Sequence, residues 1–229
     1  MTTPADTSFD PHCTLCPRLA GFLAEGKLQY PRYHCAPVAP FGDVDARLLI
    51  VGLAPGFHGA NATGRPFTGD YAGILLYETL YAFGLSTGPQ SVSADDHLRL
   101  LDCRISNSVK CVPPGNKPLP VEIATCNRYL AHELAGVKEG TVLLALGAIA
   151  HGAVLRALGL KQAAFGFAHG AEHTLPRNLT MVDSYHCSRY NTNTRRLTTD
   201  MFRRVVARAA QLARTRASEL PLTPNPEPL

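Results

Sequence analysis

The sequence predicts an α/β protein with three layers, in which helices cover both faces of a central, mainly parallel four-stranded sheet. Three observations predict this fold. Apolar runs of strand length recur along the chain, helical periodicity fills the segments between them, and polar loops follow most of the runs. Strands that alternate with helices favour a parallel sheet, because a crossover helix returns the chain to the same edge.

Four apolar runs are expected to be the strands. They span residues 47–53, 104–109, 141–147 and 179–184. Most of them are nearly continuous in apolar residues, which is typical of strands that are covered on both faces.

Helical periodicity is expected over residues 71–83, 120–134, 148–158 and 199–214. Pro120 and Glu122 favour a helix start, and Gly159 favours the end of the preceding helix. In the last helix the apolar residues share one face, and the arginines fall largely off that face.

Length and composition favour a single domain. The chain has 229 residues, of which 45% are apolar, and this suffices for one sizeable core over residues 1–216. Four prolines between residues 221 and 228 predict a disordered tail over 217–229. Residues 1–10 lack the regions of a signal peptide, and no apolar run approaches the ~20 residues of a membrane span. We therefore expect a cytoplasmic protein that does not contact membranes.

The net charge of +4 is unevenly distributed. Residues 186–216 hold eight arginines and one acid, Asp200, so this segment alone carries +7. A solvated helix face is one explanation. A phosphate-binding surface is favoured, because all eight residues are arginine and the run begins at a polar loop.

Cysteines indicate a metal centre. Their number, seven, is odd, which argues against a fully paired disulfide framework. Cys13 and Cys16 form a C-x2-C pair, and Cys111 and Cys126 complete a plausible set of four thiolates. Ordinary buried cysteines and a zinc site are alternatives, although zinc ribbons usually carry two short knuckles. A [4Fe–4S] cluster tolerates the irregular spacing. Of the remaining cysteines, Cys103 is expected in the core, and Cys187 lies in a polar loop that allows it to be exposed.

Three polar loops follow the first, second and fourth predicted strands, over residues 54–70, 110–119 and 185–198. In a parallel sheet these loops meet beyond the carboxyl ends of the strands, where ligands bind. The glycines of the first loop allow the backbone to approach a ligand closely, but the Lys-Ser/Thr of a phosphate-binding P-loop is missing.

Individual residues in these loops have two interpretations each. Phe67 is either a core residue or a platform for stacking a base. Asp70 is either a helix cap or an acid. Asn107 is either an amide at a strand end that forms hydrogen bonds with the backbone or a residue that recognises the base. Asn116 is either a turn residue or a second residue that recognises the base. His186 differs from the other histidines because it opens a polar loop just past a strand.

The segments GLAPG with GRPFTGD, NSVKCVPPGNKP and HCSRYNTNTRRLT resemble the motifs of the uracil-DNA glycosylase superfamily, most closely its iron–sulfur family 5. The resemblance covers Cys13 to about Leu212 and includes the four cysteines. It implies an αβα fold, a [4Fe–4S] cluster and excision of uracil or related deaminated bases from double-stranded DNA. The sister iron–sulfur family has an acid where this chain has Leu53, so Asp70 becomes the candidate acid.

The resemblance implies a role for each candidate. His186 would donate a hydrogen bond to the negative charge that develops on the base, and Asp70 would stabilise the sugar cation or orient water. The base-binding candidates are Gly52, Ala54, Phe67, Asn107 and Asn116. The DNA-binding candidates are Ser188, Arg189, Tyr190 and Arg195, with Tyr190 as the wedge that fills the gap left by a flipped base. The cluster would be structural, and the protein would be a monomer associated with the nucleoid.

Three other functions are compatible with parts of the pattern. The first is a non-catalytic iron–sulfur protein that binds DNA damage; the branch of the superfamily that behaves this way has a basic insertion, which residues 165–177 lack. The second is an iron–sulfur or zinc protein in redox chemistry or regulation. The third is a basic nucleic-acid-binding module whose affinity falls steeply with salt.

Overall fold

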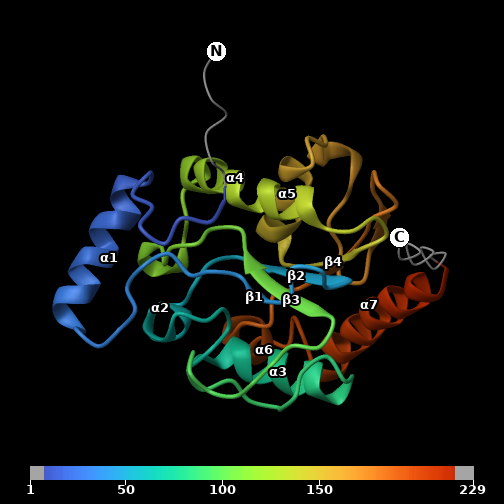
Figure 1. The fold of residues 1–229 in the computed structure, drawn as a ribbon, viewed down its shortest axis with the longest axis horizontal. Coiled ribbons are helices and arrows are strands. Elements are labelled where there is room, and N and C mark those ends of the chain that lie inside the picture. Colours follow the sequence, from blue (N-terminus) through green and yellow to red (C-terminus); the bar gives the residue numbers. More distant parts are fainter. Residues whose placement is uncertain (1–7, 220–229) are drawn as a thin grey trace, which may run out of the picture.

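The computed structural model describes residues 8–219 and has the three layers that the sequence predicts (Figure 1). The strands of the single sheet lie in the order β1-β3-β2-β4-β6-β5. Their bounds are Phe41–Gly42 for β1, Leu48–Gly52 for β2, Cys103–Asn107 for β3, Val142–Leu146 for β4, Glu172–Thr174 for β5 and Thr180–Ser184 for β6.

The four central strands are the predicted ones, and β3, β2, β4 and β6 run parallel to their neighbours. The sheet nevertheless has six strands rather than four. The additional strands, β1 and β5, lie antiparallel at the two edges. Each has only two or three residues and pairs on one side only, so neither is long enough to show an alternating pattern.

The predicted helices correspond to α3, α4, α5 and α7. The helices span Pro17–Gln29 (α1), Ala60–Thr63 (α2), Tyr71–Ala82 (α3), Pro120–Gly136 (α4), Ala148–Ala157 (α5), Arg189–Asn193 (α6) and Thr199–Glu219 (α7), with 3₁₀ turns at Pro114–Asn116 (η1) and Gln162–Ala164 (η2). Residues 217–219 of the predicted tail belong to α7, and the rest of that tail lies outside the described residues.

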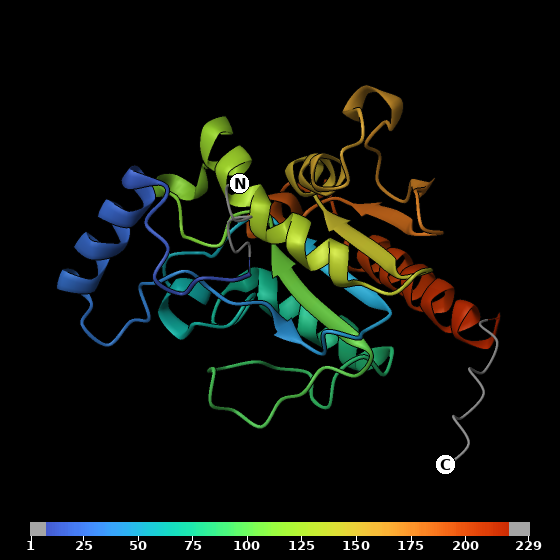
Figure 2. The ribbon, with the colours of Figure 1, turned by 45° about the horizontal axis from the view of Figure 1, so that its top comes forward.

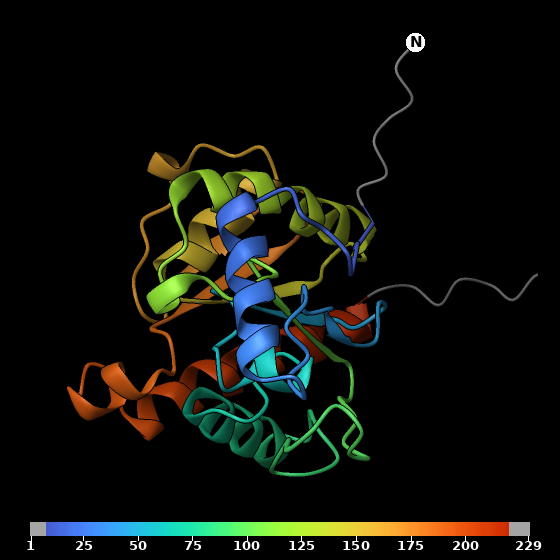
Figure 3. The ribbon, with the colours of Figure 1, turned by 90° about the vertical axis from the view of Figure 1, so that its left-hand side faces the viewer.

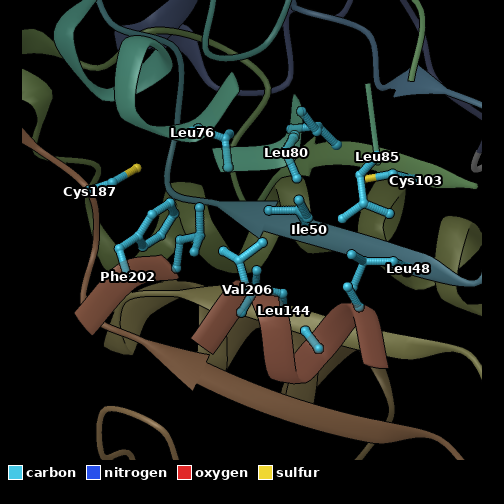
Figure 4. Close-up of a cluster of buried hydrophobic side chains, with 14 of the residues drawn as sticks. Leu48, Ile50, Leu76, Leu80, Leu85, Cys103, Leu144, Cys187, Phe202 and Val206 are labelled. Atoms are coloured by element: carbon cyan, nitrogen blue, oxygen red, sulfur yellow. The ribbon is translucent and has the colours of Figure 1, made fainter. Parts of the chain in front are cut away.

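Two hydrophobic layers hold the helices on the sheet. Leu48 and Ile50 of β2 point to one face, where they pack against α3 and α7, while Leu49 and Val51 point to the other, against α4 and α5. Figure 4 shows the first layer, with Phe202 of α7 facing the sheet. Figure 2 shows α4 and α5 along one face of the sheet and α7 on the other. Burial on both faces explains why the strand sequences are continuously apolar.

Two cysteines outside the predicted quartet belong to the first layer. Cys103 is buried in β3, as predicted. Cys187 is not exposed, although it lies in a polar loop that allows exposure: its side chain is fully buried, and its thiol donates to the carbonyl oxygen of Ala72 at 3.5 Å. The apolar surroundings of the loop after β6 account for this difference.

The topology places a crevice at one end of the sheet. β2 is followed along the sheet by β3 on one side, and β4 is followed by β6 on the other side. The strand order therefore reverses between the neighbouring strands β2 and β4. A ligand site is expected at the carboxyl ends of such a strand pair. Figure 3 shows α6, in orange, projecting from the molecule, and α1 lying beside the sheet layers. None of the helices in the described part combines the length and the apolar composition needed to cross a membrane.

Candidate active site

A pocket of about 440 Å³ opens at the predicted crevice. Its walls come from the carboxyl ends of β2, β4 and β6, from the starts of α3, α5 and α6, and from η1. Its lining residues are Leu53, Ala54, Gly56, Asp70, Tyr71, Ala72, Asn116, Leu146, Gly147, Ala148, Ile149, His186, Ser188 and Arg189. Volumes of this order accommodate small ligands.

Asp70 lies at the start of α3 and lines the pocket. Its Oδ1 accepts a hydrogen bond of 3.0 Å from the backbone N–H of Gly73, so the residue is an N-cap. Its Oδ2 lies against Gly56 and Gly59, where a Cβ would come within 3.0 and 2.6 Å of that oxygen. One carboxylate oxygen therefore caps the helix while the other is held beside two glycines of the pocket loop, and capping does not exclude a chemical role.

His186 lines the pocket two residues after the end of β6. Its carbonyl oxygen accepts from Nδ2 of Asn191 at 2.8 Å, which fixes the backbone beneath the ring. Burial lowers the pKa of His186, and the nearby Asp70 carboxylate partly opposes this. Because an ordinary histidine titrates near 6.5, a lowered pKa leaves the ring neutral at pH 7, with one nitrogen able to donate.

Phe67 forms a second layer behind the pocket wall. Its ring is only 6% exposed and stacks on the His186 ring, with centroids 5.8 Å apart and planes inclined by 24°. Gly52 lies against the same ring and against the Asn107 side chain. A Cβ on Gly52 would approach Cε2 of Phe67 to 2.6 Å and Asn107 Oδ1 more closely still, so only glycine fits at the end of β2.

The two candidate asparagines occupy different places. Asn116, in η1, lines the pocket, whereas Asn107 is 3% exposed at the end of β3. The Oδ1 atom of Asn107 is buried and accepts no hydrogen bond from the described residues. Such atoms are rare in folded proteins and demand an explanation. Among the predicted base-binding residues, Ala54 and Asn116 thus line the pocket, while Gly52, Phe67 and Asn107 lie behind it.

Two of the four predicted DNA-binding residues line the pocket, and the other two lie outside its lining. Ser188, which caps α6, and Arg189 line it. The Arg189 guanidinium lies over the Tyr71 ring, 5.2 Å from its centroid. Tyr190 is 73% exposed on α6, and Arg195 is exposed just beyond that helix, away from the pocket lining.

The sequence did not indicate one wall of the pocket. This wall consists of Leu146, Gly147, Ala148 and Ile149, where β4 passes directly into α5. The segment is apolar throughout, so it carried no polar signal. Gly147, with φ +99°, was the available clue, because a glycine between a strand and a helix indicates a special backbone conformation.

The four candidate cysteine ligands converge on a second, small apolar pocket. Cys13 and Cys16 precede α1, Cys111 follows β3, and Cys126 lies on α4; all four line this pocket. Burial raises the pKa of Cys111 to about 12 and that of Cys126 to about 11, with the neighbouring thiols contributing. None of the four forms a disulfide. Four free thiols around one cavity fit a metal centre, because thiolates are ligands for zinc and for iron–sulfur clusters.

Among the described residues, no three of the four thiols lie within 4.8 Å of one another. A single zinc with ~2.3 Å bonds draws its four sulfurs to within roughly 4 Å of one another. In the described residues, the only group of three or more potential ligand atoms within 4.8 Å is His151, His173 and Asp183. That group is a hydrogen-bonded set, in which the Asp183 carboxylate lies 2.9 Å from a nitrogen of each histidine.

The chain is similar to known proteins over most of its length. The family model described as Uracil DNA glycosylase superfamily matches residues 39–210. A type-5 uracil-DNA glycosylase of Thermus thermophilus is 47% identical over 206 residues, which is 88% of this chain and 94% of that protein. One from Pyrobaculum aerophilum is 41% identical over 87% of this chain and 88% of that protein. A type-4 uracil-DNA glycosylase of Thermotoga maritima is 38% identical over 48% of this chain and 49% of that protein.

Proposed function

The chain belongs to the uracil-DNA glycosylase superfamily, and on this premise we propose that it hydrolytically excises uracil from double-stranded DNA and leaves an abasic site. One observation carries the proposal most directly: Asp70 and His186 line the same pocket at the switch point of the sheet, with the Phe67 ring behind it. Other deaminated bases, such as hypoxanthine, are proposed as further substrates.

In this proposal, the target base reaches the pocket by leaving the DNA double helix. Flipping a nucleotide out of a duplex costs a few kcal/mol, which stacking and hydrogen bonds in the pocket must offset. We assign stacking to Phe67 and reading of the pyrimidine edge to Asn107 or Asn116, whose amides offer both a donor and an acceptor. Phe67 and Asn107 lie behind the pocket lining, so in this proposal the entering base displaces the side chains that cover them. The buried Oδ1 of Asn107 supports a role toward a ligand, since a base N–H would satisfy it.

Cleavage of the glycosidic bond between C1′ and N1 leaves the electron pair on the base and positive charge on the sugar. Neutral His186 donates a hydrogen bond to O2 of the departing base and so stabilises its negative charge. Asp70 stabilises the cationic sugar or orients the water that attacks C1′. The hydrogen bond from Gly73 supports this assignment, because it holds the carboxylate in one orientation.

The duplex lies across the mouth of the pocket in this proposal. Ser188, Arg189 and Arg195 contact phosphates, which position the DNA without reading its sequence. Tyr190, 73% exposed on projecting α6, inserts where the base has left the stack.

We further propose that Cys13, Cys16, Cys111 and Cys126 hold a [4Fe–4S] cluster. The four free thiols around one cavity, and their wide spacing, support an iron–sulfur cluster over a single zinc. When bound, such a cluster supplies a cross-link between α1, α4 and the segment after β3, and hydrolysis needs no electron from it. Residues 1–216 are proposed to form a single glycosylase domain, which acts as a monomer associated with the nucleoid.

Strand cleavage after alkali, measured on a duplex with one uracil, tests the function, with Asp70→Asn beside the wild type. The amide oxygen of asparagine still accepts from the Gly73 N–H, so the variant should remain folded while uracil release falls by roughly 10² or more. Release that is unchanged by the mutation would return Asp70 to helix capping alone. Tight, salt-sensitive binding of damaged duplexes without any release, from uracil or hypoxanthine, would instead support the non-catalytic alternative.

A further inference from the structure

The loop that carries Phe67 contains a strained turn. Residues 65–68 form a β-turn closed by a 3.3 Å hydrogen bond from the Thr68 N–H to the Arg65 carbonyl. Pro66 occupies the second position, and Phe67, with φ +54°, occupies the third. Turns with positive φ at the third position favour glycine there, and a bulky residue persists in that conformation only when its surroundings impose it.

The first end of this turn is anchored by Arg65, whose side chain is buried. Its guanidinium donates to Ser91 Oγ at 2.9 Å, to the Ala94 carbonyl at 2.7 Å and to the Asp96 carboxylate. It also lies over the Phe41 ring, 4.3 Å from the centroid. All three hydrogen-bond partners belong to one segment, residues 91–96.

The other end of the turn is anchored to the same segment. The hydroxyl groups of Thr68 and Ser91 lie 2.7 Å apart, so Ser91 contacts the residues at both ends of the turn. Inside the turn, the Tyr77 hydroxyl donates to the Pro66 carbonyl at 2.9 Å. Both chain neighbours of Phe67, Pro66 and Thr68, therefore have fixed hydrogen-bond partners.

The 91–96 segment is itself organised by one carboxylate. Asp96 accepts hydrogen bonds from the backbone N–H groups of Val92 at 2.8 Å, Ser93 at 3.3 Å and Leu98 at 3.1 Å. Burial raises the pKa of Asp96, but the hydrogen bonds from Arg65 and the backbone outweigh this and lower it to about 2. The Asp96 carboxyl is thus ionised near neutral pH, where it accepts from Arg65.

We propose that the 91–96 segment is a positioning element of the active site, which holds both ends of the strained turn and thereby sets the Phe67 ring 5.8 Å from His186. Ser91, Asp96 and Arg65 are positioning residues, because they act on the base through Phe67. The inference rests on the proposed function. It makes Ser91, a residue outside the resembling motifs, a determinant of the rate of base release.

Ser91→Ala tests the proposal with a minimal change, and Ser86→Ala is its matched control. Ser86 is a buried serine that donates to Gly88 nearby and does not contact the turn. Loss of the two hydrogen bonds of Ser91 should lower the single-turnover rate of uracil release about tenfold, with KM within about twofold. Ser86→Ala should stay within about twofold of the wild type in both constants.

A double-mutant cycle identifies the route of the effect. If Ser91 acts through Phe67, Ser91→Ala should cause no further loss of rate in a Phe67→Ala background. The same tenfold loss in that background would overturn the proposal, as would a Ser91→Ala rate equal to that of Ser86→Ala.

Hydrogen exchange separates this proposal from the proposed function. The Thr68 amide should exchange about tenfold faster in Ser91→Ala than in Ser86→Ala, because the turn that it closes opens more readily. This readout needs no catalysis. A wild type that releases no base would sink the proposed function alone, whereas unchanged exchange at Thr68 would sink the positioning role alone.

Discussion

A single methyl group added at Gly52 tests the packing behind the pocket. Gly52 ends β2 with its Cα against the Phe67 ring and the Asn107 amide. In Gly52→Ala, the new Cβ would lie 2.6 Å from Phe67, whereas ordinary contacts begin at 3.4 Å, so the ring must retreat by 0.8 Å. Asn107 must move as well, because its Oδ1 is closer still to the added carbon.

We expect Gly52→Ala to lower both the folding stability of the protein and its rate of uracil release. Overpacking of a buried site costs about 1–3 kcal/mol, and in a domain of this size each kcal/mol lowers Tm by about 2–4 °C. Displacement of a substrate-positioning group by ~1 Å can slow catalysis by ~10²-fold. We therefore expect a fall in Tm of several degrees together with a roughly hundredfold lower rate of uracil release.

Thermal unfolding and single-turnover uracil release measure the two effects, with Gly21→Ala as the control. Gly21 lies on α1, and a Cβ there meets nothing within 4 Å. Alanine in this exposed helix should stabilise the protein slightly, by about 0.5–1 kcal/mol, and leave the rate unchanged. A Gly52→Ala protein with wild-type Tm and rate would refute the close packing of Gly52 against Phe67 and Asn107.

Three further results are expected. Burial holds the pKa of His186 below its unfolded value near 6.5. The contribution of neutral His186 to folding stability is therefore fully present above pH 6.5 and is lost as the pH falls through the folded pKa. The rate of uracil release, measured from pH 5 to 8, should fall on the acid side in the wild type but not in His186→Gln. Arg189→Ala should weaken binding to all duplexes alike and reduce the salt slope by about 1, and a loss confined to one base would contradict its phosphate role. Cys126→Ser should lose iron and acid-labile sulfide together while Cys35→Ser keeps both, and a colourless, zinc-loaded wild type would contradict the cluster.

Patterns that are local in the sequence allowed much of the fold to be predicted. The four central strands show continuous apolar runs because helices cover both faces, and the motif loops follow three of them. The edge strands β1 and β5 were missed since two or three residues carry no periodicity. Helix α1 was also missed, although Pro17 at its first turn was a usable signal.

That Asp70 and His186 line one pocket was predictable, because both lie in polar loops that follow strands. It was not predictable where burial or distant contacts decide the placement. Gly147 and Ile149 form a wall without a polar signal, and the burial of Cys187 depends on packing across the sheet. The hydrogen bonds from Arg65 to the 91–96 segment join residues about thirty positions apart through a loop with no recognisable motif, so only the folded chain reveals them.

The positions of the four thiols have a consequence for the order of assembly. Cys13 and Cys16 leave the ribosome first, yet their partners Cys111 and Cys126 follow only after most of β2, α3 and β3 has been made. A shared metal centre would close a loop of roughly a hundred residues, which removes conformational freedom from the unfolded chain much as a long-range disulfide does. Helix α1, although it is synthesised first, would then be tied to the rest of the domain only after Cys126 on α4 has been made.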